Sequence, residues 1–105
     1  MKCAGKRRGW GRKMNKNHLI GTKELTYDNA HKMKLEYFLI SEDRERTRSL
    51  YGIRIRKTVD ARQVETETTP ALSASRDFVE QMIYKLMVNT VTPITLYEVV
   101  DDLIG

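Results

Sequence analysis

The clearest pattern in this sequence is an alternation of apolar and polar residues over residues 32–40. In a β-strand, successive side chains point to opposite faces of the sheet, so this spacing predicts a strand with one buried face. The buried face comprises Met33, Leu35, Tyr37 and Leu39. A second alternation over residues 49–57 places Tyr51, Ile53 and Ile55 on one face and Arg54 and Arg56 on the other. Together they predict a sheet with one apolar side.

Weaker signals indicate the segments that precede, connect and interrupt these two strands. Residues 19–27 are a strand candidate, and residues 27–31 favour a turn because Asp and Asn bond locally to the backbone. Residues 41–48 are strongly charged and predict a solvated hairpin loop. Gly52 interrupts the strand over residues 49–57, which indicates either a bulge or a close approach of another backbone segment.

Residues 62–68 show a further period-two alternation and predict one more strand. Glu65 and Glu67 lie on one of its faces. Opposite charges on neighbouring strands attract each other, so we expect these carboxylates to pair with Arg54 and Arg56 across the two strands. Such exposed ion pairs contribute less than about 1 kcal/mol each and mainly help to set the register.

The C-terminal third of the chain predicts two helices. Ser73 or Ser75 is positioned to cap the first of them, because its hydroxyl can accept a free N–H of the first turn. The apolar stripe of this helix comprises Phe78, Val79, Met82, Ile83, Leu86 and Met87. Thr95 and Glu98 have the spacing of a capping box at the start of a short final helix. That helix is expected to bury Leu96, Val99, Val100 and Leu103.

The order of these elements predicts the fold class. Strands come first, helices follow, and the connections between strands are too short for a parallel crossover. We therefore expect an α+β domain over residues 18–105. Its architecture is an antiparallel three- or four-stranded meander followed by two C-terminal helices packed on one face.

The charge is concentrated at the N-terminus. Residues 1–23 contain eight Lys and Arg residues and no acid, and the remaining residues carry 11 bases against 14 acids. The first part is therefore +8 and the rest −3, which gives the net charge of +5. Residues 1–17 have too little apolar surface to offset the entropy of ordering, so we expect a disordered basic tail. A second hypothesis for residues 1–13 is an upstream leader that was joined to the protein ahead of Met14.

The basic tail also suggests nucleic-acid binding. Guanidinium and ammonium groups contact phosphates, and an indole stacks on an exposed base. The residues for this role are Lys6, Arg7, Arg8, Trp10, Arg12 and Lys13.

Several classes of function have no support in the sequence. The one cysteine, Cys3, and the two histidines, His18 and His31, have no companions at metal-ligand spacing, so we expect no metal, cofactor or catalytic residue. The longest unbroken apolar run covers residues 37–40, far short of the roughly 18 needed for a transmembrane helix. A single cysteine and no secretory signal favour the reducing cytoplasm.

The segment from Tyr51-Gly52-Ile53 through the amphipathic helix to the acidic final helix resembles a small bacterial family of unknown function. The likeness covers residues 33–105 and includes the turn Val91-Thr92-Pro93-Ile94-Thr95-Leu96. The resemblance implies no activity, and it carries no catalytic residues.

The function itself stays unknown from the sequence, and three hypotheses remain. The first is a non-enzymatic protein-interaction or regulatory module, with an unidentified protein or a second copy as partner. Its predicted contact surface is the turn formed by Val91, Thr92, Pro93, Ile94 and Leu96. The alternative is the nucleic-acid binder described above. The third is a small enzyme that works only as an oligomer, with a shared pocket lined by Glu65, Glu67 or His31.

Overall fold

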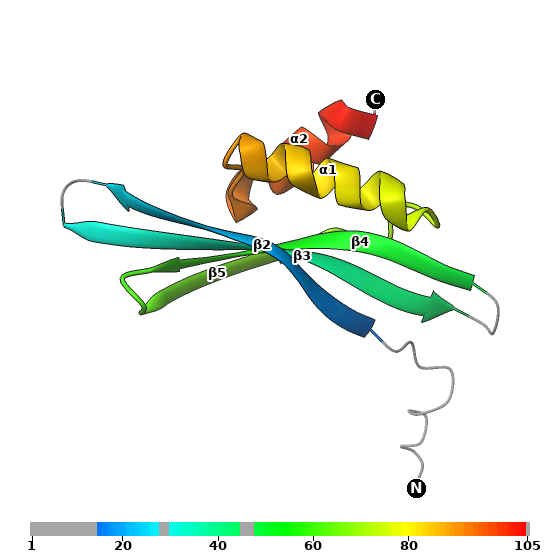
Figure 1. Cartoon of the computed structure of the whole chain (residues 1–105), viewed down its shortest axis with the longest axis horizontal. Helices are drawn as coiled ribbons and strands as arrows, with labels where there is room; N and C mark the ends of the chain where they lie inside the picture. The colour runs from blue at the N-terminus through cyan, green and yellow to red at the C-terminus, as the bar shows by residue number, and fades with distance from the viewer. Residues whose placement is uncertain (1–14, 28–29, 45–47, 105) are drawn as a thin grey trace, which may run out of the picture.

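A computed structural model describes residues 15–27, 30–44 and 48–104 of the chain. Four strands form one antiparallel sheet in sequence order, so the sheet is a meander (Figure 1). The strands are β2 (Asn15–Tyr27), β3 (His31–Arg44), β4 (Arg48–Val59) and β5 (Gln63–Thr68).

The helical layer lies on one side of this sheet (Figure 1). It consists of α1 (Arg76–Val88), the 3-10 turn η2 (Pro93–Thr95) and α2 (Leu96–Ile104). This arrangement confirms the predicted α+β meander with two C-terminal helices on one face.

The hydrophobic core fills the space between the helices and the sheet. Both predicted apolar strand faces contribute to it, and so do four of the six residues of the predicted helix stripe. Phe78 is instead 46% exposed, and Met87 is partly buried at the edge of the core. Its buried members are Leu35, Tyr37, Leu39, Ile53, Ile55, Val79, Met82, Ile83, Leu86, Val91, Leu96 and Val100. Burying a large aliphatic side chain contributes roughly 1.5–3 kcal/mol, so this layer supplies most of the driving force for folding.

The strands run further than the alternation predicts. β3 continues to Arg44 and β4 begins at Arg48, so most of the charged segment predicted as a loop belongs to the hairpin ladder. Asp43 pairs with Ser49 in register, and the Ser49 hydroxyl donates to Asp43 Oδ1 at 2.9 Å. β2 still pairs with the first part of this extension, with Lys16 opposite Ser41 and Asn15 opposite Glu42, so the polar residues continue a ladder that the core already anchors.

Gly52 marks a close backbone approach and not a bulge. The pairing of β3 with β4 is regular across it, with Gly52 opposite Ile40. A Cβ atom at this position would lie 3.0 Å from the carbonyl oxygen of Pro70 and 3.0 Å from Thr69 Oγ1. The irregularity in the sheet lies elsewhere, between Leu19 and Gly21 of β2.

The two helices begin differently. Ser75 is the N-cap of α1, and its hydroxyl accepts the Phe78 N–H at 3.2 Å, which confirms one of the two predicted caps. Thr95 does not form the predicted capping box, because it lies inside η2 with its hydroxyl 3.4 Å from the Thr92 carbonyl oxygen. The chain therefore enters α2 through a 3-10 turn.

Polar contacts fix the end of α1 against the sheet. The Lys23 ammonium group on β2 donates to the Met87 carbonyl and to the Thr90 hydroxyl, both at 2.8 Å. The Met87 carbonyl lies in the last turn of α1 and also accepts the Thr90 N–H at 3.1 Å, and a cation is favourable at this negative end of the helix. The buried Tyr37 hydroxyl donates to the Val91 carbonyl at 2.9 Å. These contacts hold the helical layer on one face of the sheet, and no described helix covers the opposite face.

Candidate functional site

The face of the sheet opposite the helices, here called the open face, is built from side chains in cross-strand rows. The register places one residue from each strand in each row. The first row is Leu19, Phe38, Arg54 and Thr68, the second is Thr22, Glu36, Arg56 and Thr66, and the third is Glu24, Lys34, Thr58 and Val64. Apolar, aromatic and charged groups therefore share one surface.

Arg54 is held by neutral partners. Its Nε donates to Thr68 Oγ1 at 2.9 Å, and its Nη1 donates to Asn17 Oδ1 at 3.2 Å. Both acceptors are uncharged, so these hydrogen bonds orient the guanidinium group without neutralising it. The side chain spans the sheet from β5 to β2.

Arg56 is neutralised within the face. Its Nε lies 2.9 Å from Glu36 Oε1, and its Cζ atom lies 5.6 Å from the centre of the Phe38 ring. The first contact is an ion pair and the second a cation–π contact, each of which favours one rotamer of the arginine. The result is a fixed Phe38–Arg56–Glu36 group in the middle of the open face.

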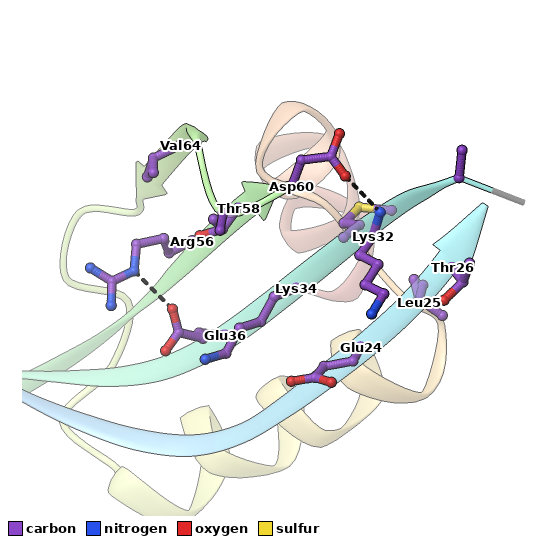
Figure 2. Close-up of a pocket in the computed structure, with 13 residues that line it drawn as sticks. Glu24, Leu25, Thr26, Lys32, Lys34, Glu36, Arg56, Thr58, Asp60 and Val64 are labelled. Atoms are coloured by element: carbon purple, nitrogen blue, oxygen red, sulfur yellow. Dashed lines mark hydrogen bonds and ion pairs between the residues drawn. The ribbon is translucent and has the colours of Figure 1, made fainter. Parts of the chain in front are cut away.

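A hollow of about 950 Å³ lies on this face beside that group (Figure 2). Residues from all four strands line it, and Glu24, Lys32, Lys34, Arg56, Thr58 and Val64 carry the argument below. Within the part of the chain that the structure describes, neither Lys32 nor Lys34 has a carboxylate within ion-pair distance of its ammonium group. The hollow thus combines available positive charge with an apolar wall.

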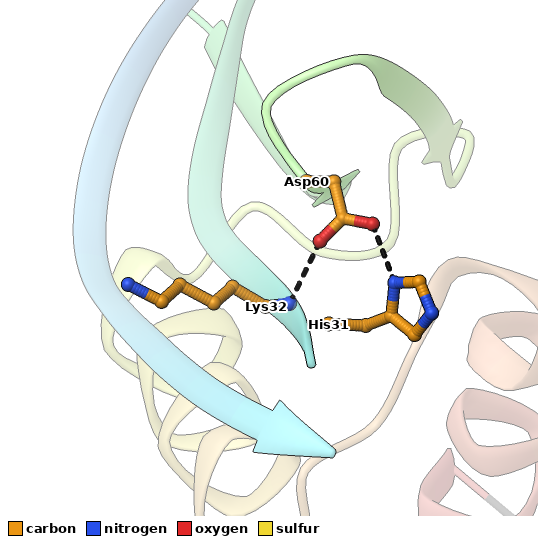
Figure 3. A network of polar contacts seen from close by, with 3 residues as sticks. All are labelled: His31, Lys32 and Asp60. Carbon is orange, nitrogen blue, oxygen red and sulfur yellow. Dashed lines mark hydrogen bonds and ion pairs between the residues drawn. The ribbon is translucent and has the colours of Figure 1, made fainter. Parts of the chain in front are cut away.

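The rim of the hollow is fixed by the turn between β4 and β5. Asp60 and Ala61 both have positive φ angles, 52° and 59°. The Lys32 N–H donates to Asp60 Oδ1 at 2.9 Å, and His31 Nδ1 lies 2.7 Å from Asp60 Oδ2 (Figure 3). The hydrogen bond from the Lys32 N–H, followed by that from His31, lowers the pKa of the Asp60 carboxyl group. The turn is thereby tied to the start of β3.

Charged side chains are spread over the wall of the hollow. Among residues 15–27, 30–44 and 48–104, no three His, Cys, Asp or Glu side chains are grouped to hold a metal ion. Among these charged residues, Lys32, Lys34 and Glu36 come from β3, Glu24 from β2 and Arg56 from β4 (Figure 2).

The predicted contact turn is only partly available on the surface. Val91, Pro93 and Leu96 are buried and therefore cannot contact a partner in the folded domain. Thr92 is partly exposed, and Ile94 is 75% exposed. The physical reason is that this turn returns the chain to the sheet, so alternate side chains enter the core.

The predicted ion pairs of Glu65 and Glu67 with Arg54 and Arg56 are wrong. Thr68 and Thr66 are the register partners of the two arginines, so both glutamates point to the helical side of the sheet. Glu65 lies instead 3.7 Å from Lys57 Nζ. The hollow on the open face is lined by neither glutamate nor by His31.

Two parts of the predicted site have different outcomes. The basic residues Lys6 to Lys13 lie outside the described residues, so the nucleic-acid hypothesis for the tail stays a prediction. The sequence did not predict that Phe38 belongs to the site, where it lies beside Arg54 and Arg56. Its parity along β3 showed that it faces away from the core, but only the register with β4 places it beside Arg54 and Arg56.

Comparison with known proteins gives a family and no more. No curated protein matches the chain, and no solved structure does. Within the described residues, no helix has the length and apolar character needed to cross a membrane. A family model matches residues 16–105, which include all four strands, both helices and the open face. The chain therefore belongs to this family, which is described as a family of unknown function (DUF6514).

Proposed function

We propose that the chain is a non-enzymatic module that binds another protein through the open face of its sheet. The observation that carries this proposal is that the two faces of the sheet differ in what covers them. Helices cover one of them, while the other keeps apolar groups beside positive charges that no described carboxylate neutralises. We further propose that the module acts in the bacterial cytoplasm.

The composition of the open face supports a protein partner. Leu19 is 53% exposed on β2, and Val64 is 58% exposed on β5, so apolar side chains stand at both sides of the sheet. Phe38 and the arginines lie between them. Aromatic residues and arginine are enriched at the centres of protein interfaces, which suits a protein partner for this face.

The rigidity of the face also favours binding. Arg54 is held by Thr68 and Asn17, and Arg56 by Glu36. A side chain that is already ordered loses less entropy when a partner arrives, and this loss is about 0.5–1.5 kcal/mol for each mobile side chain that becomes fixed. A face ordered in this way retains more of its contact energy as affinity.

The experiment is site-specific photo-crosslinking in cells. A photoreactive residue is placed at Thr66, which is exposed on the open face, or at Gln81, which is exposed on α1. We expect a discrete protein adduct from position 66 and none from position 81. The adduct should disappear when Leu19→Glu and Val64→Glu are added, because two charges then oppose burial of the face.

Three results would contradict the proposal. One is labelling of the same proteins from both positions, since it indicates non-specific contact. Another is survival of the adduct in the double glutamate variant. The third is an adduct with twice the mass of the chain, which would identify a second copy as the occupant.

A further inference from the structure

We infer that the open face recognises an extended acidic protein segment whose two acidic groups are about six residues apart. This inference rests on the proposed function and specifies the partner of the same surface. It follows from which cations on the face are neutralised, how far apart the remaining ones are, and what lies between them.

The cations of the open face differ in their partners. Arg56 has Glu36 at ion-pair distance. The ammonium group of Lys34 has no described carboxylate within that distance, but Glu24 lies directly opposite it in register and partly offsets its charge. Arg54, by contrast, bonds to the neutral Thr68 and Asn17. Lys32 has no carboxylate within ion-pair distance of its ammonium group among the described residues. Arg54 and Lys32 therefore remain as two positive positions for a ligand.

The distance between these positions determines the size of the ligand. Arg54 lies opposite Phe38, and Phe38 is six residues from Lys32 along β3. At about 3.3 Å per residue, the two positions are roughly 20 Å apart. A single small anion cannot reach both. An extended segment reaches both with acidic residues about six positions apart, because its rise per residue equals that of the strand beneath it.

The surface between Arg54 and Lys32 does not favour further acidic groups in the bound segment. Along this stretch Glu36 is paired with Arg56 and Glu24 lies opposite Lys34, so the cations there are offset and need no acidic partner. Val64 and Phe38 offer apolar contact there. The middle of the segment is therefore uncharged and partly apolar. A nucleic acid carries a phosphate at every nucleotide and meets both glutamates, so the charge pattern favours a protein segment.

The test uses the full chain and three fluorescent decapeptides in an anisotropy titration. The first peptide has two glutamates six positions apart and only Thr, Val and Ala elsewhere. The second has the same composition with the two glutamates adjacent, and the third has glutamine in place of both. We expect the first to bind most tightly.

Matched protein variants test the two positions on the face. Arg54→Gln and Lys32→Gln should each weaken binding of the first peptide about threefold to fivefold, the size of one partly exposed charge pair. Lys85→Gln removes the same charge from α1 and should leave binding unchanged. The circular dichroism spectrum and thermal midpoint of each variant are compared with those of the wild type, which distinguishes the loss of a charge from a loss of folded structure.

The outcomes separate this inference from the proposed function. Equal binding of the first two peptides, equal weakening by Lys85→Gln, or no binding of any charged peptide would overturn the acidic-segment inference. Tighter binding of a single-stranded RNA oligomer than of the first peptide would overturn it as well. If the crosslinks from position 66 persist in any of these cases, the module still binds a protein, but one of different chemistry.

Discussion

The hydrogen bond between Tyr37 and Val91 joins the central strand to the turn that precedes α2, so its removal should destabilise the whole domain. Tyr37 is fully buried, and its hydroxyl donates to the Val91 carbonyl at 2.9 Å. Tyr37→Phe keeps the ring but leaves that carbonyl without this donor. Loss of one partner of a buried hydrogen bond lowers the free energy of unfolding by about 1–3 kcal/mol.

The expected change in the melting temperature follows from the size of the domain. For a folded unit of about 90 residues, the entropy of unfolding is about 0.19 kcal/mol per kelvin. A loss of about 1.5 kcal/mol then lowers the melting temperature by about 8 °C. Urea unfolding followed by circular dichroism gives the free energy, and a thermal scan gives the midpoint.

The same residue predicts a loss of stability at high pH. Burial raises the pKa of Tyr37 from 10.0 to about 12. Between these values the unfolded chain releases the proton while the folded chain keeps it, so stability is complete below pH 10 and falls as the pH rises. The loss approaches about 3 kcal/mol at pH 12. Because other groups titrate in this range, the measured quantity is the difference in slope between the wild type and Tyr37→Phe.

The control for both measurements is Tyr84→Phe, because Tyr84 is 52% exposed on the outer side of α1. We expect this variant to match the wild type in stability and in pH dependence. A Tyr37→Phe variant that loses no more stability than Tyr84→Phe, or that keeps the wild-type slope above pH 10, would refute the reasoning.

Three further predictions concern single positions in the sheet. Gly52→Ala should lower the free energy of unfolding by about 1–3 kcal/mol in urea, because the new Cβ lies 3.0 Å from the Pro70 carbonyl oxygen; an unchanged midpoint would contradict this close approach. Ala61→Gly should raise it by about 0.5–1 kcal/mol, since the φ angle of 59° is unfavourable for alanine, and a fall in the thermal midpoint would argue against the turn geometry. Asp60→Asn should destabilise the domain near neutral pH. Because the pKa of Asp60 is lowered on folding, its contribution is present above the ordinary value of 3.8 and is lost as the pH falls below it, so the two proteins should converge in acid. A difference that stays constant from neutral pH to acid would contradict this assignment.

The sequence predicts which side chains of a strand share a face, but not how the strands align with each other. The alternation in β3 and β4 correctly separates the core residues from Phe38, Arg54 and Arg56. For β5, the alternation is also correct, yet the predicted ion pairs are wrong. The alignment of β5 depends on the turn at Asp60 and Ala61, where both residues have positive φ angles. Such turns favour Asn and Gly, so Asp-Ala gives a weak signal in the sequence.

The same limit applies to the candidate site. The hollow takes side chains from four strands, so it exists only once their register is known. The burial of much of the predicted contact turn has a related reason. The sequence places Val91, Pro93 and Leu96 between two helices, where apolar residues suit either a partner or the core. The Tyr37 hydroxyl bonds to the Val91 carbonyl and shows that this turn packs inward.

The irregularity at Ile20 has a consequence for how copies of the domain avoid each other. Among the described strands, β2 is an outer strand and runs for 13 residues, long enough to recruit a neighbouring chain into a growing ribbon. The shift between Leu19 and Gly21 breaks the even spacing of donors and acceptors along that border. A strand from another molecule could therefore pair with the backbone of β2 on one side of the break but not on both sides. We therefore expect the break at Ile20 to hinder fibrillar stacking along β2 while it leaves the open face unchanged.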